Sequence, residues 1–184
     1  SRYGVVAMAS STDVVGPLTR TVADAELLSE ILAGPDGKDS TVHDDYFISQ
    51  TTDKPLKIGL IREFIGDGVD EQVVTSTKAF VDRLKSAGHT VEEVDLPMAK
   101  YSLAIYYIVV PAEVSSNLAR YDGVRYGLRS ATAKSLDDVY GQSRDQGFMP
   151  ENKRRIMIGS YVLSSGYFDA YYLQAQKART LLIQ

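Results

Sequence analysis

Apolar and polar residues follow two different spacings in the first part of the chain. After Thr21, apolar side chains recur every three to four positions, which predicts a helix that ends at Gly34-Pro35. Thr21 suits the N-cap position, and Asp24 is then the third helical residue. The expected apolar face consists of Val22, Ala25, Leu28, Ile31 and Leu32. A polar loop is expected to follow over residues 35–55.

The next segment has the pattern of a βαβ unit. Residues 57–61 read KIGLI, which is typical of a short buried strand, and residues 90–96 read TVEEVDL, a second strand. Between them lies a helical pattern that ends at Gly88, and its apolar face is expected to comprise Val73, Thr77, Phe80, Val81 and Leu84. Strand, helix and strand in residues 57–96 therefore predict two parallel strands joined by a right-handed crossover.

The pattern changes from Lys100 onward. Helical spacing dominates residues 101–120, 135–146, 151–164 and 168–184, with glycine or serine clusters between these segments. Most of the 12 tyrosines also lie in this part of the chain. The pattern thus predicts an α/β fold with an α/β portion over residues 1–99 and a mainly helical, tyrosine-rich portion over residues 100–184.

Composition narrows the class of protein. The chain has 184 residues, a net charge of −4 and 44% hydrophobic residues, which is typical of a globular protein and argues against a nucleic-acid wrapper. It contains no cysteine, so disulfides and thiolate chemistry are excluded. The longest apolar run, residues 103–112, includes Pro111 and is shorter than the ~18 residues of a membrane span. We therefore expect a soluble, cytoplasmic protein without membrane contact. The sequence starts without a methionine, and its last helical pattern has no terminating glycine or proline, so we expect a piece of a longer chain.

Several residues could carry chemistry, and most have a structural interpretation. His43 and His89 lie outside any catalytic-triad motif and are expected at the surface, and two histidines without cysteine argue against a zinc site. Gly66-Asp67-Gly68 lacks the spacing of a phosphate-binding loop, so we interpret it as a strand-to-helix turn. The serine pairs at 10–11, 115–116 and 164–165 have no lysine or histidine at a motif spacing and are interpreted as helix-entry or loop hydroxyls.

A basic run on the third predicted helix of the second half is the strongest candidate. Lys153, Arg154 and Arg155 are consecutive, so they point about 100° apart and cannot share one exposed face. Arg155 lies four residues before Gly159, whose missing side chain could leave room for an inward guanidinium that binds a carboxylate. A solvated basic helix turn is the alternative. Residues 117–127 (NLARYDGVRYG) are interpreted either as a turn held by Arg-Asp pairs and tyrosine stacking or as a recognition surface.

Five segments of the sequence resemble a known family. They are SRYG at 1–4, the S-x-D-x-x-G-P pattern within 9–17, NLARYDGVRYG at 117–127, KRRI at 153–156 and LSSGYFDAYY at 163–172. In this order they resemble the amidase signature family and, within it, the glutaminase subunits of tRNA-dependent amidotransferases. The resemblance implies a fragment of the amidase signature fold, a mixed sheet covered by helices, and it covers residues 1–184 as part of a single amidase domain.

The resemblance also implies a function for the longer protein. A serine nucleophile, assisted by a second serine on a cis peptide and by a lysine, attacks the glutamine side-chain amide and releases ammonia. The ammonia then converts Glu-tRNA(Gln) or Asp-tRNA(Asn) to Gln-tRNA(Gln) or Asn-tRNA(Asn). Both serines and the lysine are expected upstream of Ser1, so this chain alone is expected to be inactive, and Ser164-Ser165-Gly166 does not match the catalytic segment.

Two substrate contacts are implied within the chain. Tyr106 matches a tyrosine of the glutamine pocket, and Arg155 matches an arginine that holds the amino-acid end of glutamine. The resemblance implies no cofactor on this chain, ATP and Mg at a partner subunit, two other subunits in a heterotrimer, and tRNA bound mainly through the partner. Two alternatives stay open: a fragment of a stand-alone amidase, and a non-catalytic scaffold module that docks a protein through its tyrosine-rich half.

Overall fold

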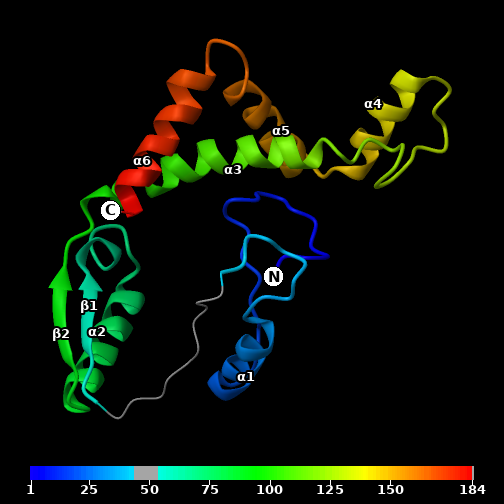
Figure 1. Ribbon diagram of the computed structural model, residues 1–184. Coiled ribbons are helices and arrows are strands. Elements are labelled where there is room, and N and C mark those ends of the chain that lie inside the picture. Colours follow the sequence, from blue (N-terminus) through cyan, green and yellow to red (C-terminus); the bar gives the residue numbers. More distant parts are fainter. Residues whose placement is uncertain (44–53, 184) are drawn as a thin grey trace. The chain divides into compact units, whose positions relative to one another are not determined.

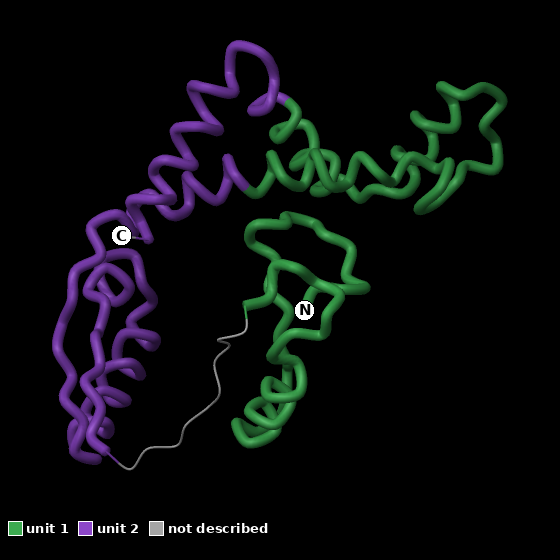
Figure 2. The backbone as a smooth tube through the Cα atoms, in the orientation of Figure 1, with its two compact units in different colours: residues 1–51, 110–160 green, residues 52–109, 161–184 purple. Residues whose placement is uncertain are grey.

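The computed structural model describes residues 1–43 and 54–183. The predicted polar loop at residues 35–55 therefore lies largely outside the described residues. The chain divides into two compact units, and each combines segments that are distant in sequence: residues 1–51 with 110–160, and residues 52–109 with 161–184 (Figure 2). We refer to them as unit 1 and unit 2. The division at residue 99 rests on composition and stays a prediction.

Unit 2 contains the predicted βαβ motif. Strand β1 (Lys57–Ile61) and strand β2 (Thr90–Val94) pair in parallel, with Ile58 opposite Val91. Helix α2 (Glu71–Ser86) connects them and lies along the strand pair (Figure 1). Asp70 caps this helix by accepting a hydrogen bond from the backbone N–H of Gln72 at 2.8 Å. The α/β prediction, the two strands and their parallel direction are confirmed.

The burial of this motif differs from the prediction. Along α2 the half-buried positions are Val74, Thr77, Val81 and Leu84, so Thr77, Val81 and Leu84 lie on the inner face as expected, whereas Val73 and Phe80 are exposed. Phe80 is 52% exposed, and its ring packs under the guanidinium of Arg83 at 5.5 Å instead of against the strands. No residue of β1 or β2 is buried in the part of the chain that the structure describes. The buried strand predicted from KIGLI is therefore only half-covered here.

Helix α1 (Val22–Leu32) in unit 1 begins where the sequence predicts. Thr21 Oγ1 accepts a hydrogen bond from the backbone N–H of Asp24 at 3.1 Å, and Gly34 follows the helix end with φ +96°. The apolar face is predicted to be internal, but Val22 and Ile31 are 85% and 70% exposed. The described part of unit 1 therefore leaves the apolar face of α1 uncovered.

The second half is helical, as predicted. Its elements are the 3₁₀ helix η2 (Pro97–Tyr101), α3 (Ser102–Leu118), α4 (Leu136–Gly147), α5 (Pro150–Val162), the π-helical turn η3 (Phe168–Leu173) and α6 (Gln174–Ile183). Ser135 and Asp138 form a capping box at the start of α4. The predicted helix at 168–184 thus starts as a π-helical turn. Among the described residues, no helix is long and apolar enough to cross a membrane.

Each unit has a small apolar core around one half of α3. In unit 1, Val110 and Val114 pack with Ala9 from the N-terminal segment. In unit 2, Ile105 and Val109 pack with Ala175 from α6. The two halves of α3 therefore carry side chains into different cores, and the residues of greatest functional interest project from this helix and from α5.

Candidate functional site

The basic run of α5 is arranged as a set of ion pairs. Arg155 Nε donates to Oε1 of Glu151 at 3.0 Å, and Arg154 Nη1 donates to Oε2 of the same carboxylate at 2.8 Å. Lys153 Nζ pairs with Asp145 of α4 at 2.5 Å. The side chain of Arg155 is 23% exposed, whereas that of Arg154 is 69% exposed. Arg155 is therefore the least exposed cation of the run, and its guanidinium is chemically able to bind a carboxylate.

Gly159 does not provide the space that the sequence pattern suggests. The gap left by its missing side chain is filled by α3: a Cβ on Gly159 would lie 1.9 Å from the carbonyl oxygen of Pro111 and 2.7 Å from Cβ of Ser115. Ser115 and Ser160 share a hydrogen bond of 2.9 Å beside this contact. The absence of a side chain at Gly159 thus allows α5 to pack closely against α3 in unit 1.

Tyr106 lies on the part of α3 that belongs to unit 2. Tyr106 is 44% exposed, and its ring meets the ring of Tyr107 edge-on, with centroids 5.3 Å apart and planes at 85°. Ile105, the preceding residue, points into the core of unit 2, so the helix fixes Tyr106 on the accessible side. Tyr106 belongs to unit 2, whereas Arg155 belongs to unit 1.

The S-x-D-x-x-G-P segment forms a tight loop that is tied to α3. Asp13 accepts hydrogen bonds from the backbone N–H groups of Met8 at 2.8 Å and Ala9 at 3.1 Å, which closes the loop on itself. Glu113 of α3 accepts from the backbone N–H of Ser11 at 2.8 Å and from its hydroxyl at 2.5 Å. Ser11 is therefore a loop residue whose hydroxyl donates to Glu113, which agrees with its interpretation as a loop hydroxyl.

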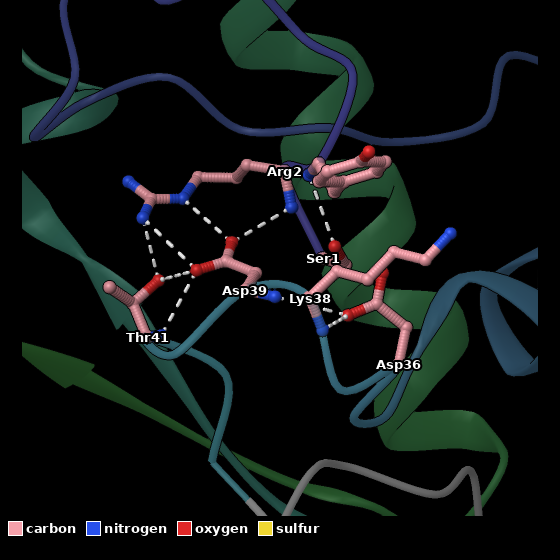
Figure 3. Close-up of polar contacts among 7 residues, drawn as sticks. Ser1, Arg2, Asp36, Lys38, Asp39 and Thr41 are labelled. Atoms are coloured by element: carbon pink, nitrogen blue, oxygen red, sulfur yellow. Dashed lines mark hydrogen bonds and ion pairs between the residues drawn. The ribbon is translucent and has the colours of Figure 1, made fainter.

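A second polar cluster joins the N-terminal segment to the residues after α1 (Figure 3). Asp39 accepts from the backbone N–H of Arg2 at 2.9 Å and from its Nε at 3.1 Å, while the Nη2 of Arg2 also donates to the hydroxyl of Thr41 at 2.7 Å. The Asp39 side chain is 9% exposed. The Arg2 side chain and then the Thr41 hydroxyl hold the pKa of Asp39 far below its ordinary value of 3.8.

This cluster borders a cavity of about 390 Å³ in unit 1. Its lining includes the charged residues Arg2, Asp13, Lys38, Asp39 and Arg120. Lys38 Nζ lies 4.7 Å above the ring of Tyr3, and the guanidinium of Arg120 donates to the Asn117 backbone carbonyl at 2.8 Å. The positively and negatively charged side chains that line the cavity thus contact neighbouring residues of its wall.

After α3 ends at Leu118, residues 119–127 form a turn, one of the two interpretations left open. Asp122 accepts from the backbone N–H of Val124 at 2.8 Å, and this bond lowers the pKa of Asp122. Gly123 has φ +79° and packs against Ser143, because a Cβ added at Gly123 would lie 2.4 Å from Oγ of Ser143. Arg144 of α4 donates to the Leu118 and Tyr121 carbonyls rather than to an aspartate. The turn is therefore held by hydrogen bonds of the Asp122 and Arg144 side chains to backbone groups, rather than by the Arg-Asp pairs of that interpretation.

The remaining candidates have structural roles. His89 Nδ1 accepts from the backbone N–H of Leu56 at 3.1 Å, which anchors the entry to β1, and its side chain is half-buried rather than exposed. Ser164 Oγ donates to the Tyr161 carbonyl at 2.7 Å. Residues 66–68 form the turn that leads into α2. Within the described ranges, no group of three or more His, Cys, Asp or Glu is placed to hold a metal ion.

Three tyrosines form a cluster at the end of α5 and the start of η3. The ring centroids of Tyr161 and Tyr167 are 4.3 Å apart, and Tyr171 lies 6.2 and 6.1 Å from them. A hydrogen bond with Tyr167 raises the pKa of Tyr161 to about 12. These three tyrosines of the tyrosine-rich half are thus accounted for by ring packing.

Sequence reasoning missed two acidic partners. Glu151 lies four residues before Arg155, and the i, i+4 spacing of a helical ion pair could have identified it. Asp39 lies 37 residues from Arg2, and no local pattern connects the two. The first contact was readable from helix geometry, whereas the second required the tertiary structure.

One protein family matches the chain over its whole length. A family model described as Amidase matches residues 1–184. The A subunit of glutamyl-tRNA(Gln) amidotransferase from Myxococcus xanthus is 50% identical over 99% of this chain, and that of Carboxydothermus hydrogenoformans is 53% identical over 99%. This chain spans 38% and 39% of the lengths of these curated relatives.

Solved structures agree with the sequence relatives. The crystal structure of the A subunit of glutamyl-tRNA(Gln) amidotransferase from Thermotoga maritima matches 99% of this chain with a TM-score of 0.68 and 34% identity, and the match covers 36% of that chain. The crystal structure of an amidase, at 22% identity and a TM-score of 0.62, shares the fold. Since the family model spans all 184 residues, the chain belongs to the amidase family.

Proposed function

We propose that this chain is part of the glutaminase subunit of a tRNA-dependent amidotransferase. The observation that carries the proposal is the identity of about half of all residues to several A subunits of glutamyl-tRNA(Gln) amidotransferase, over 99% of the chain. A family-level match alone would leave a stand-alone amidase equally supported. The identity to one named subfamily over the whole chain favours the tRNA-dependent enzyme.

In this proposal the chain supplies substrate contacts rather than the nucleophile. The two catalytic serines and the lysine would belong to another part of the protein, since this chain spans only 38% of the length of its relative. Arg155 would bind the α-carboxylate of glutamine through paired hydrogen bonds, and Tyr106 would line the pocket. With glutamine held, attack on the side-chain amide releases ammonia, and water then releases glutamate from the acyl enzyme.

The exposed apolar faces support a larger protein. Val22 and Ile31 of α1 are largely exposed, and β1 has no buried residue in the described structure. Surfaces of this kind are normally covered by further chain or by a partner. We propose that the remaining part of the sheet covers them. Two further subunits would take the ammonia to the charged tRNA, and ATP with Mg²⁺ would act at the partner subunit, with tRNA bound mainly there.

The test compares two preparations in a glutaminase assay. Residues 1–184 alone are expected to release no ammonia from glutamine, because the nucleophile is assigned elsewhere. The complete subunit with its partners is expected to hydrolyse glutamine and to amidate Glu-tRNA(Gln) or Asp-tRNA(Asn). Glutamine hydrolysis by residues 1–184 would refute the division of roles. A complete protein that hydrolyses other small amides and leaves glutamine untouched would instead favour a stand-alone amidase.

A further inference from the structure

We propose that the polar cavity of unit 1 binds the phosphate group of a small ligand. The cavity has a volume of about 390 Å³, which is within the range of small-molecule sites, and its wall combines the N-terminal segment, the stretch after α1 and the end of α3. Three cations against two acids give this wall one net positive charge. The cations are Arg2, Lys38 and Arg120, and the acids are Asp13 and Asp39.

Both acids of the wall are already bonded to protein groups. Asp39 accepts from the backbone N–H and the Nε of Arg2 and from the backbone N–H and the hydroxyl of Thr41 (Figure 3). Asp13 accepts from two backbone N–H groups of its own loop. Since these carboxylates have little accepting capacity left, the cavity is poorly suited to a cationic ligand.

The cations, in contrast, keep hydrogen-bond donors that no acid takes. The ammonium of Lys38 lies 4.7 Å above the ring of Tyr3, and among the described residues it has no ion pair with an acid. Arg120 donates through Nε and Nη2 to Asn117 at 2.8 and 3.1 Å, and within the same described ranges its Nη1 has no acceptor. Two positively charged groups therefore present unused donors, which is the requirement for binding an anion.

The wall around Arg120 is held in place before any ligand arrives. Asn117 accepts from Arg120 through Oδ1 and donates through Nδ2 to Oγ of Ser10 at 2.8 Å. One amide thus connects the guanidinium to the N-terminal loop, and the hydroxyl proton of Ser10 stays available as a further donor. A wall that is fixed in this way loses little conformational freedom on binding, which favours affinity.

The placement of the donors favours phosphate over a carboxylate. Lys38 and Arg120 come from segments far apart in the sequence, and Ser10 adds a hydroxyl from a third segment. A carboxylate has two oxygens in one plane, and a single guanidinium edge satisfies both of them. A phosphate group has more oxygens, arranged as a tetrahedron, so it can accept from several donors that surround it. Neither Arg155 nor Tyr106 lines the cavity, so this inference goes beyond the proposed function.

The experiment titrates the complete subunit with inorganic phosphate in a calorimeter at constant ionic strength. Lys38→Ala and Arg120→Ala should each weaken the Kd about tenfold, because each removes a charged donor. Lys38→Arg keeps the charge and should stay within about threefold of the parent. Lys57→Ala is the matched control, since its ammonium pairs with Glu92 in unit 2, and it should leave the Kd unchanged.

Denaturant unfolding without phosphate shows whether each variant is folded. If Arg120→Ala does not fold, the exposed Lys38 decides the question alone, through Lys38→Ala against Lys38→Arg. No phosphate binding by the complete subunit would overturn the proposal. A Kd that stays the same in the folded Lys38→Ala variant would also overturn it, because the phosphate would then bind elsewhere.

Competition experiments identify the class of ligand. Glycerol phosphate should displace inorganic phosphate, whereas acetate at the same ionic strength should not. Equal displacement by acetate would overturn the preference for phosphate. A short single-stranded RNA that displaces phosphate better than glycerol phosphate does would assign these cations to a nucleic-acid backbone and would overturn the small-ligand site.

Discussion

Gly159 on α5 lies so close to Pro111 on α3 that a Cβ at Gly159 would stand 1.9 Å from the Pro111 carbonyl oxygen. The obstacle is helix backbone, which cannot move aside as a flexible side chain could. The contact holds the helix that carries Arg155 against the helix that carries the core residues Val110 and Val114.

Gly159→Ala should therefore destabilise the protein by about 3 kcal/mol, because the two helices must separate to admit the methyl group. The measurement is denaturant unfolding of the complete subunit. Gly141→Ala in α4 is the control, since its Cβ would meet nothing within 4 Å. That control should be neutral or stabilise the protein by up to about 1 kcal/mol. Equal stability of Gly159→Ala and the parent would contradict the close packing of α5 on α3.

The ion pair between Arg2 and Asp39 predicts a pH dependence of stability. The folded-state pKa of Asp39 is lowered, mainly by the Arg2 side chain, so its stabilising effect is present above the unfolded-state pKa near 3.8 and is lost as pH falls. The stability difference between the parent and Asp39→Asn should thus be full above roughly pH 5 and shrink below roughly pH 4.

Thermal unfolding over a pH series measures this difference. Asp67→Asn, in the turn before α2, makes the same charge change away from the cluster and serves as the control. A difference between parent and Asp39→Asn that stays constant from neutral pH to roughly pH 3 would show that the charge of Asp39 contributes nothing.

The tyrosine cluster predicts an unusual phenol titration. The pKa of Tyr161 is raised to about 12, mainly by its hydrogen bond with Tyr167. Tyr167→Phe should return it toward the ordinary value of 10, since the bond that favours the neutral phenol is lost. Ultraviolet titration of phenolate formation follows this change, and Tyr172→Phe is the control. If the titration near pH 12 persists in Tyr167→Phe, the hydrogen bond is not the cause.

How far the sequence predicts this structure depends on the range of the interactions involved. The Thr21 cap, the strand at Lys57–Ile61 and the parallel βαβ unit follow from local patterns and are confirmed. The exposure of Phe80 on α2 depends on what packs against the helix, which periodicity does not define. The sequence pattern suggests that Gly159 leaves room for a guanidinium, but the other helix fills that space.

The candidate site shows the same limit. The lesser exposure of Arg155 within its basic run follows from helix geometry, and its partner Glu151 could have been read from the same spacing. The pairing of Arg2 with Asp39 spans 37 residues, so only the tertiary structure reveals it. The roles of Tyr106 and Arg155 toward glutamine rest on family resemblance and stay predictions.

Tyr106 offers a test of the pocket independent of Arg155. Tyr106→Ala in the complete enzyme should raise the KM for glutamine about tenfold, because a wall of the pocket is lost. Tyr106→Phe keeps the ring and removes the hydroxyl, so it distinguishes the contributions of the two groups. Tyr107→Ala removes the neighbouring ring, which meets Tyr106 edge-on. It should affect KM less than Tyr106→Ala. The reverse order would assign the pocket to Tyr107.

The most direct measurement is the KM for glutamine of Arg155→Ala in the complete amidotransferase, beside its activity with added ammonium. We expect a rise in KM of about a hundredfold, because the substrate carboxylate loses its charged partner, with ammonium-dependent amidation unchanged. An unchanged KM for glutamine, with ammonium-dependent activity intact, would contradict the claim that this chain contributes Arg155 to the glutamine site.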